Sequence, residues 1–558
     1  MDFDSLARGP RAYVLLGLLA LALFLPGIAN LPVTDRDEAR FAQATRQMLE
    51  TGDYVNIRFQ DQARQKKPAG IHWLQAASVR LAAGGDGAKI WAYRLPSALG
   101  AAAAVLALFA LARPVLGAAP AFFGAAILAG ALLTVVEAHI AKTDAVLLLC
   151  TVAAQGALLG LYGRENLPER GAAALAYLFW AALGAGVLIK GPVVSFIALA
   201  TLATLAIADR RSGGAGRLWR KLRPASGILL SLAIAAPWFV AITLEDGGFL
   251  SGAVTGDLLP KLLGGHESHG APPGYYLALA PLSFWPGVLL VPFGLIWAWR
   301  HRAEPALRFC LAWLVPAWIA FELMPTKLPH YVLPLYPAAA LAAGKAAIAG
   351  REWMTATLGR WPARLWLLVW GLAGLALAAL LPAIARFLTD APMPAAAWAG
   401  AAAALLGLAA GTIATLRHAP LAAIGTATPA MALFTGLAFA AALPAMSPLW
   451  PSRAAQALIA AHQGAPRPAI AASGYHEPSL VFALGTATRL TTPEDAAKHL
   501  AAERQALALI ERSTEDKFRA AARGLGVSVR ALGAVQAFNL AKGRNVILTL
   551  YRADQATP

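Results

Sequence analysis

Acidic and basic side chains gather at the edges of apolar segments in the first 340 residues of this chain. The cationic and neighbouring residues at such edges are Arg40, Arg64, Lys66, Lys67, Lys142, Lys190, Lys327, His330 and Tyr331. Asp37 and Glu38 follow the first apolar run, and Asp144 opens a later one. Cations at an apolar boundary can bind an anion, and a lipid phosphate has a suitable charge and depth. A carboxylate beside them can accept a proton or orient a substrate.

Each of these residues also has a structural explanation. Asp37 could close a capping box with Thr34, and Asp144 could cap the apolar helix that follows it. Lys327 could be a lysine whose ammonium reaches the membrane interface. Taken one at a time, these residues indicate little. Their convergence on one side of a membrane favours a site.

Two histidines, His266 and His269, lie three residues apart in a Gly-rich loop. They could bind a metal, although two histidines alone indicate this only weakly. A divalent metal is therefore possible but has no further support, and no cofactor is predicted with certainty.

The elements that carry these residues are predicted to be membrane helices. The chain has 558 residues, of which 58% are hydrophobic and only 14% charged, and its mean hydropathy is +0.58. Apolar windows of about 18 residues or more indicate spans. We predict about thirteen spans, near residues 12–32, 92–114, 119–137, 142–162, 171–187, 190–208, 224–243, 276–299, 305–323, 330–348, 362–386, 396–416 and 421–445.

The net charge of +17 comes largely from short loops between these spans. The basic loops are 209–224, 300–308, 350–364 and 417–418. They fall on one side of the membrane if the number of spans is right, which is the positive-inside pattern. We therefore expect a cytoplasmic amino terminus, an inner-membrane location and a periplasmic carboxyl end. The charge needs no nucleic-acid partner to explain it.

The chain divides into two predicted domains. Residues 1–448 form the membrane domain, in which 34–91 is a first periplasmic loop with helices along the membrane surface. Residues 449–558 read as a small soluble α/β domain. Its predicted strands include PAIAAS and ALALIE, TTPEDAAKHLAA predicts a helix, and VQAFNLA and NVILTLYRA flank a hairpin turn.

Several motifs together resemble a known superfamily. They are DRDEARFAQATRQMLETGDYV, KKPAGIHWL, RLPSALGA, AKTDAVLL, GVLIKGPV, PWFVAI, PPGYYL and TKLPHYVLPLYP, in this order across residues 35–340. The chain thereby resembles the GT-C polyprenyl-phosphate-dependent glycosyltransferases. More narrowly, it is similar to the bacterial transferases that add aminoarabinose to lipid A, which are akin to protein O-mannosyltransferases.

This resemblance implies roles for particular residues. Asp37 matches the acidic residue at the reaction centre, and Asp144 matches a second acidic position at the outer start of the fourth span. Lys67 matches the lysine that contacts the donor phosphate, and Tyr331 matches a position near the same phosphate. The auxiliary phosphate-binding candidates are Lys66, Arg64, Lys190 and Lys327, and the supporting candidates are Glu38, Arg40 and His330. The chain departs from its relatives at KKPAGIHW, where they often have an acid in place of Lys66.

The expected reaction transfers a sugar from a polyprenyl phosphate to a lipid or glycan acceptor on the periplasmic face. Lipid A is the acceptor that the resemblance favours, and a protein acceptor is the alternative. The leaving phosphate needs cations and hydrogen-bond donors but no general acid. Asp37 would act as base if the acceptor is a hydroxyl. Direct displacement predicts inversion at the anomeric carbon.

Two alternative functions are a transporter and a binding subunit. A transporter or flippase for lipid-linked sugars should show related halves and charged or broken helices near mid-membrane. The sequence shows neither clearly, and its unusual charges favour one end of the spans. A binding subunit without chemistry would tolerate loss of Asp37.

Overall fold

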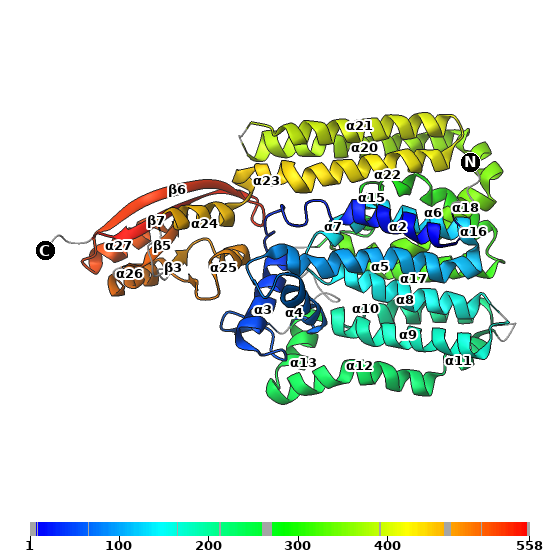
Figure 1. The fold of residues 1–558 in the computed structure, drawn as a ribbon, viewed down its shortest axis with the longest axis horizontal. Coiled ribbons are helices and arrows are strands. Elements are labelled where there is room, and N and C mark those ends of the chain that lie inside the picture. Colours follow the sequence, from blue (N-terminus) through cyan, green and yellow to red (C-terminus); the bar gives the residue numbers. More distant parts are fainter. Residues whose placement is uncertain are drawn as a thin grey trace.

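The computed structural model describes residue 7 and residues 9–64, 66–164, 166–210, 214–258, 270–389, 392–462, 470–503 and 505–554. Long helices run side by side in one part of the molecule, and a sheet with short helices extends beyond one end of this bundle (Figure 1). Helices α3 (Asp37–Thr51) and α4 (Gly70–Ala82) lie between the two parts.

Helices occupy every apolar segment for which a span is predicted. An apolar run of this length forms a helix because a helix satisfies its own backbone hydrogen bonds away from water. The elements are α2 (Gly9–Phe24), α5 (Ile90–Leu116), α6 (Ala118–Gly130), α7 (Leu132–Ala138), α8 (Asp144–Tyr162), α9 (Glu169–Lys190), α10 (Val193–Ala208), α12 (Pro224–Glu245), α15 (Tyr275–Ser283), η2 (Gly287–Leu289), α16 (Val291–Arg300), α17 (Pro305–Leu323), η3 (Pro329–Leu335), α18 (Tyr336–Ala349), α20 (Trp361–Leu388), α21 (Ala395–Leu416), α22 (Pro420–Leu437), η4 (Ala438–Ala442) and α23 (Leu443–Ala445).

The predicted number of thirteen spans is not confirmed. Within the described residues, nine helices are long and apolar enough to cross a membrane, and the bent pair α6 and α7 would make a tenth. Helices α2 and α10 have only 16 residues each, and the segment predicted at 276–299 is interrupted between α15 and α16. The chain is a multi-pass membrane protein, but its breaks and short helices make the count depend on tertiary structure.

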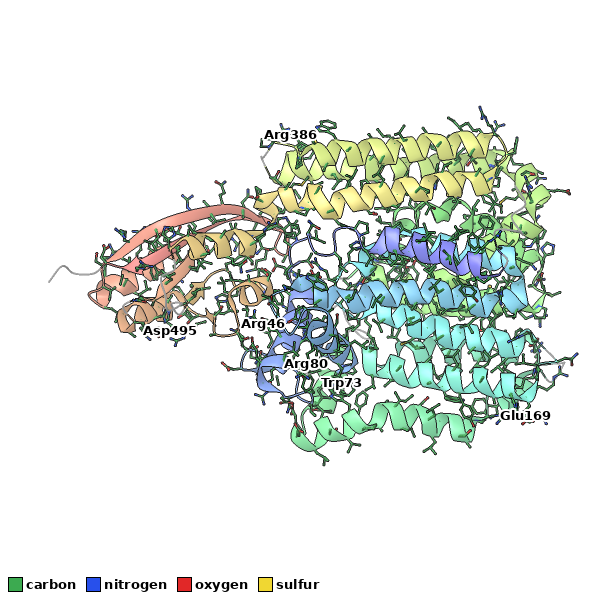
Figure 2. The ribbon with its side chains drawn as sticks, in the orientation of Figure 1. Arg46, Trp73, Arg80, Glu169, Arg386 and Asp495 are labelled. Atoms are coloured by element: carbon green, nitrogen blue, oxygen red, sulfur yellow. The ribbon has the colours of Figure 1, made fainter. Side chains whose placement is uncertain are left out.

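Short helices cover the two ends of the bundle. Helix α11 (Gly214–Lys221) and α19 (Arg351–Leu358) lie in the basic loops, while α13 (Phe249–Ser251) and η1 (Gly252–Leu258) follow α12. Figure 2 places Glu169, at the start of α9, at the end of the bundle opposite to Trp73 and Arg80 of α4. The chain thus separates its basic loops from the end that carries α3 and α4.

Helices α3 and α4 are joined by a short hairpin, β1 (Arg58–Phe59) and β2 (Gln62–Ala63), whose strands are antiparallel. Helix α3 ends as predicted at Gly52, which has φ of 75°, a left-handed conformation that glycine adopts without strain. The two helices pack on each other through a buried group in which the Thr45 hydroxyl donates to Gln75 and contacts the ring of His72 at 2.7 Å.

The carboxyl-terminal part begins with η5 (Ser447–Leu449) and α24 (Pro451–His462) and contains a five-stranded sheet in the order β4-β3-β5-β7-β6. Its other elements are β3 (Ile470–Ser473), α25 (Pro478–Leu484), β4 (Arg489–Leu490), α26 (Pro493–Ala502), β5 (Leu507–Glu511), η6 (Arg512–Thr514), α27 (Glu515–Gly524), β6 (Val529–Asn539) and β7 (Arg544–Ala553). Strands β3, β4 and β5 are parallel, and β7 runs antiparallel to β5 and β6. The predicted strands, helix and hairpin are confirmed.

Both faces of this sheet are covered, which explains why its central strands are continuously apolar. Leu507 and Leu509 of β5 pack with α24 and α25, whereas Ala508 and Ile510 pack with α26 and α27. Successive side chains of a strand point to opposite faces, so a strand buried on both sides has no polar alternation.

Candidate active site

Five charged or titratable side chains meet inside the bundle near the end that carries α3 and α4. Asp144 opens α8, Lys190 ends α9 and His330 lies in η3. Lys142 precedes α8, and Glu137 lies near the end of α7. Each of these side chains is at most 11% exposed. Together they form what we term the charged cluster.

Opposite charges alternate within the charged cluster. Lys190 Nζ donates a hydrogen bond to Asp144 Oδ1. Lys142 Nζ lies 2.9 Å from Glu137 Oε1 and 3.7 Å from Asp144 Oδ2. It also lies 3.2 Å from Nδ1 of His330. Because an ammonium can only donate, Nδ1 must accept, and the ring hydrogen is therefore on Nε2, which lies 3.9 Å from Asp144 Oδ1.

Asp37 and Lys67 face the charged cluster from outside the spans. The carboxylates of Glu137 and Asp144 attract the ammonium of Lys142 most strongly. Asp37, an exposed residue at the start of α3, acts on Lys142 in the same direction. Lys67, just before α4, adds positive potential at His330. The structure thus brings two predicted residues of the first loop to the charged cluster.

Tyr331 lies against the same group of residues. Lys190 Nζ is 5.6 Å from the centroid of the Tyr331 ring, within the range of a cation–π contact. The rings of His330 and Tyr331 meet edge to face, with 5.1 Å between their centroids. Tyr331 therefore borders the charged cluster on the side of Lys190.

Helix breaks place these side chains inside the bundle. Helices α6 and α7 are bent by 62° at Ala131, and the backbone N–H of Leu132 donates to the carbonyl of Trp285 instead of within a helix. Helix α9 ends directly after Lys190 because Gly191 has φ of 71°. Such breaks are tolerated at membrane depth where the backbone is buried in protein.

Glu38, not Asp37, is the acid at the start of α3 that hydrogen-bonds to Thr34. Its Oε2 accepts hydrogen bonds from the backbone N–H and the hydroxyl of Thr34, at 2.8 and 2.9 Å. The structural explanation offered for Asp37 is therefore wrong, since the residue after it takes that place. The Asp37 carboxylate is left at the surface beside the charged cluster.

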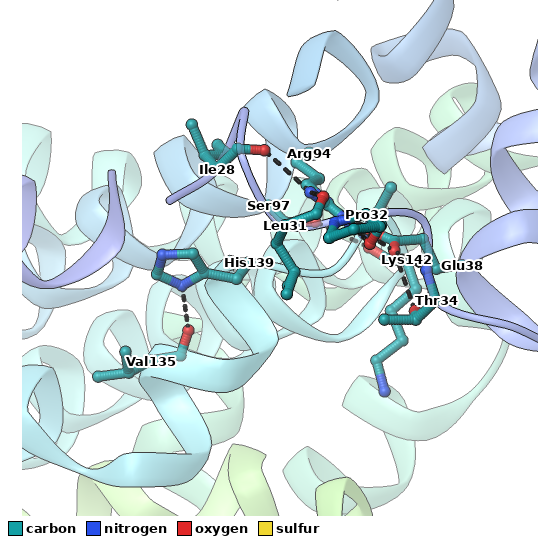
Figure 3. Close-up of polar contacts among 11 residues, drawn as sticks. Ile28, Leu31, Pro32, Thr34, Glu38, Arg94, Ser97, Val135, His139 and Lys142 are labelled. Atoms are coloured by element: carbon teal, nitrogen blue, oxygen red, sulfur yellow. Dashed lines mark hydrogen bonds and ion pairs between the residues drawn. The ribbon is translucent and has the colours of Figure 1, made fainter. Parts of the chain in front are cut away.

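Glu38 is also paired with Arg94 of α5 in a fully buried ion pair (Figure 3). Arg94 donates to both carboxylate oxygens of Glu38 and to the carbonyls of Ile28, Leu31 and Pro32. Ala141 N donates to Glu38 Oε1 at 2.9 Å. Burial opposes ionisation of Glu38, but Arg94 outweighs burial and keeps the pKa of the carboxyl below its ordinary value. The pair ties α3 to the loop that carries Lys142.

The structure places four other predicted residues outside the charged cluster. Lys327 donates to the carbonyls of Met324 and Ala271, at 2.6 and 2.8 Å. The guanidinium of Arg64 lies 4.4 Å from the centroid of the Phe41 ring. Lys66 is exposed before α4, and Arg40 is half-buried on α3. Their role in binding a donor stays a prediction.

The two histidines suggested as metal ligands, His266 and His269, lie outside the described residues. Among the residues that the structure describes, no group of three or more His, Cys, Asp or Glu side chains is arranged to hold a metal ion.

The sequence analysis assigned no role to Glu137 or Arg94, and it gave Lys142 none beyond its place in the chain. Glu137 and Lys142 could have been found from the sequence, because an ionisable residue within or beside an apolar span is a functional candidate by default. Glu137 is the last residue of a predicted span, where an acid only indicates that the helix ends. The partner of Arg94 is 56 residues away, and sequence spacing gives no indication of such a pair.

The chain is similar to several known proteins. Residues 66–240 match the family described as dolichyl-phosphate-mannose-protein mannosyltransferase. The chain is 28% identical over 335 residues to the undecaprenyl phosphate-alpha-4-amino-4-deoxy-L-arabinose arabinosyl transferase of Edwardsiella ictaluri. It is 27% identical over 328 residues to such a transferase of Pseudomonas fluorescens. Each match covers 58% of this chain, and the chain spans only 58% of the length of each of these relatives.

Solved structures show the fold. Crystal structures of ArnT from Cupriavidus metallidurans match with a TM-score of 0.76 when bound to undecaprenyl phosphate and 0.71 in the apo state, at 20% identity. The first match covers 98% of both chains. The archaeal oligosaccharyltransferase AglB from Archaeoglobus fulgidus matches with a TM-score of 0.52 at 12% identity, over 93% of this chain and 68% of that one.

The fold is therefore that of the GT-C glycosyltransferases, which confirms the fold class expected from the motifs. Within that class, the chain is similar to the undecaprenyl-phosphate aminoarabinose transferases, as the motifs indicated.

Proposed function

We propose that the protein is an inner-membrane glycosyltransferase that moves a sugar from an undecaprenyl phosphate donor to an acceptor on the periplasmic face. One observation carries the proposal. Asp37 and Lys67 of the first loop, Asp144 and Lys190 of two spans, and Tyr331 of a third segment converge on one charged cluster at one end of the bundle.

The phosphate of the donor would bind to Lys67, Tyr331 and Lys190. Lysines and a phenol suit a phosphate because each can donate hydrogen bonds to its oxygens. Lys66, Arg64 and Lys327 are auxiliary candidates from the sequence. The contacts of Lys327 with two backbone carbonyls make it the weakest of these.

The transfer exchanges one bond for another at the anomeric carbon. The bond from this carbon to the phosphate oxygen breaks, and the electron pair leaves with the phosphate, whose charge the lysines stabilise. The acceptor oxygen attacks from the opposite face, which inverts the configuration. If the acceptor is a hydroxyl, Asp37 takes its proton. If it is a phosphate, Asp37 and Asp144 orient the sugar and stabilise positive charge at the reacting carbon.

Aminoarabinose is the sugar that we favour, because the similar proteins are named as aminoarabinose transferases. Lipid A is the acceptor that we favour, because the resemblance of the motifs implies it. A protein acceptor is the second candidate, because residues 66–240 match a protein mannosyltransferase family. We also propose a domain boundary between residues 448 and 449, which falls within η5 and shortly before α24.

The test is transfer of a labelled sugar by the purified protein from undecaprenyl phosphate donors to lipid A and to peptide acceptors. We expect Asp37→Asn to lower the rate at least about 100-fold, since general base catalysis contributes that much. Asp86→Asn is the control, because Asp86 is an exposed acid before α5 that pairs with Lys89. Transfer by Asp37→Asn at the wild-type rate would remove Asp37 from the mechanism.

The same experiment separates an enzyme from a transporter. Reconstituted in vesicles, a flippase would move the labelled lipid across the bilayer without forming a new glycosidic bond. That result would refute the proposed function. A new glycosidic bond on lipid A and none on peptide would decide between the two acceptors.

The orientation is tested by labelling cysteines from one side of the membrane. Native Cys150 and Cys310 are buried, so a single engineered cysteine dominates the signal. Gln62→Cys, in the exposed hairpin, should react with an impermeant reagent from the periplasm. Ala303→Cys, in an exposed basic loop, should react only from the cytoplasm. The opposite pattern would overturn the orientation.

A further inference from the structure

The proposed reaction gives no task to Glu137, one of the two carboxylates of the charged cluster. Only 3% of the residue is exposed. Its Oε1 lies 2.9 Å from Lys142 Nζ, but its Oε2 is buried and has no hydrogen-bond partner among the residues that the structure describes. A buried carboxylate oxygen without a partner is rare in a native protein and calls for an explanation.

The neighbouring cations do not supply this partner. Lys142 directs its ammonium to Oε1 of Glu137 and to the ring of His330. Lys190 donates to Asp144. The ring nitrogen of His330 nearest to Glu137 is Nδ1, which accepts from Lys142 and lies 3.9 Å from Oε1. Within the described parts of the chain, Oε2 of Glu137 therefore receives no hydrogen bond.

A bound donor substrate would bring a hydrogen-bond donor to this oxygen. Its phosphate would lie beside Lys67, Tyr331 and Lys190, and the sugar is one bond away from that phosphate. The sugar must therefore lie next to the charged cluster, of which Glu137 is part. Sugars carry hydroxyl groups, and some carry an ammonium, and either group can donate a hydrogen bond to a carboxylate.

We propose that Glu137 is a sugar-binding residue whose free Oε2 accepts a hydrogen bond from a hydroxyl or ammonium group of the transferred sugar. This role rests on the proposed function and adds a specificity determinant to it. The unpaired oxygen then has a direct purpose, because a site that hydrogen-bonds one group of a substrate discriminates strongly against analogues that lack it.

The test pairs variants of Glu137 with variants of the sugar. The donors are undecaprenyl phosphate carrying 4-amino-4-deoxy-L-arabinose and analogues in which one hydroxyl or the amine is removed. Glu137→Gln should lower kcat/KM for the parent donor by about 10-fold, because the amide oxygen of glutamine accepts a neutral hydrogen bond in place of a charged one. For one analogue, the wild type and Glu137→Gln should differ by less than about twofold, since the bonded group is absent from both.

The analogue for which the wild type and Glu137→Gln have nearly the same kcat/KM lacks the bonded group, and so identifies it as an ammonium or a hydroxyl. Binding of sugar-free undecaprenyl phosphate should be unchanged in Glu137→Gln, because Glu137 does not contact the phosphate. Glu322→Gln is the matched control: its carboxylate is also buried, but both oxygens accept from backbone N–H groups of Gly274 and Leu277. It should lower kcat/KM equally for all donors or not at all.

A loss by Glu137→Gln that is equal for every donor, or no loss, would overturn the role of Glu137 alone. If Glu137→Gln does not fold, Glu137→Asp keeps the charge with a shorter side chain, and the same coupling to one sugar group is expected. Failure of the wild type to transfer sugar from any of these donors would overturn the proposed function itself and this role with it.

Discussion

Asp37 and Glu38 are adjacent acids with opposite surroundings. Asp37 is exposed and adds negative potential at Lys142, whereas Glu38 is buried and accepts five hydrogen bonds from Thr34, Arg94 and Ala141. A carboxylate whose lone pairs are all engaged cannot take a proton from an acceptor without breaking those bonds. This difference supports Asp37 as the reactive acid and Glu38 as the residue that positions it.

At the residue scale, we predict that Lys67→Met weakens binding of undecaprenyl phosphate by about 10- to 100-fold, as expected for a lost hydrogen bond to a charged group. The dissociation constant can be measured with a fluorescent analogue of the lipid. Lys89→Met, which removes an exposed lysine on the same side of the molecule, should have no effect. Equal binding by Lys67→Met and the wild type would remove Lys67 from the phosphate site.

At the scale of elements, the Arg94–Glu38 ion pair connects the segments that carry the residues of the site. All five N–H donors of Arg94 are used, three of them on carbonyls of the segment between α2 and α3. Glu38 in turn holds the loop that carries Lys142 through Ala141. The pair therefore sets the distance between the start of α3 and the start of α8.

We predict that Arg94→Met destabilises the protein by about 3–5 kcal/mol, because it leaves the Glu38 carboxylate buried without its cation. The double variant with Glu38→Met should recover part of this loss, since apolar residues of similar size often replace a buried pair at little cost. Thermal unfolding in detergent measures both. Arg113→Met, near the other end of α5, is the control, and a double variant no more stable than Arg94→Met would contradict the prediction.

At the scale of the molecule, α3 connects the membrane bundle to the carboxyl-terminal sheet domain. Arg46 donates to the carbonyl of Phe482, and Gln43 donates to Thr486. Asp35, directly before α3, accepts from the backbone N–H of Ser479 at 3.3 Å. A cavity of about 490 Å³ lies at this junction, with Asp35 and Ser479 in its lining. The position of the sheet domain is thereby coupled to the segment that carries Asp37.

We predict that the contact of Asp35 with the sheet domain at Ser479 becomes less stable as the pH rises. Burial raises the pKa of Asp35 from 3.8 to about 6, and the hydrogen bond from Ser479 only partly offsets it. A raised pKa means that the folded state favours the protonated acid, so its contribution to stability is complete below pH 3.8 and is lost as the pH rises through about 6. Asp35→Asn should remove this dependence.

The measurement is hydrogen exchange in residues 477–484, which contact this segment. In the wild type, exchange should increase between pH 4.5 and pH 7 after correction for the intrinsic rate, and in Asp35→Asn it should not. Asp495→Asn is the control, because Asp495 is exposed on α26 in the same domain. An equal increase in the wild type and Asp35→Asn would exclude Asp35 as the cause.

The sequence by itself determined where the apolar helices and four of the five strands of the sheet domain lie, and which superfamily the chain resembles. Helices form in apolar runs because length and hydropathy are local properties, and those four strands were recognisable for the same reason. Motif order also indicated the fold class. Asp37, Asp144, Lys67 and Tyr331, named from the motifs, do converge on one region of the structure.

Only the tertiary structure decided which charges meet. Helix packing brings Glu38 to Arg94 and Glu137 to Lys142. It also sets the contacts of Lys327 with backbone carbonyls. The number of spans depends on the same packing, because a bent or interrupted helix is stable only where its neighbours satisfy its backbone. Apolar patterning places a helix in the membrane, but the partners of a buried charge follow from the assembly of distant segments.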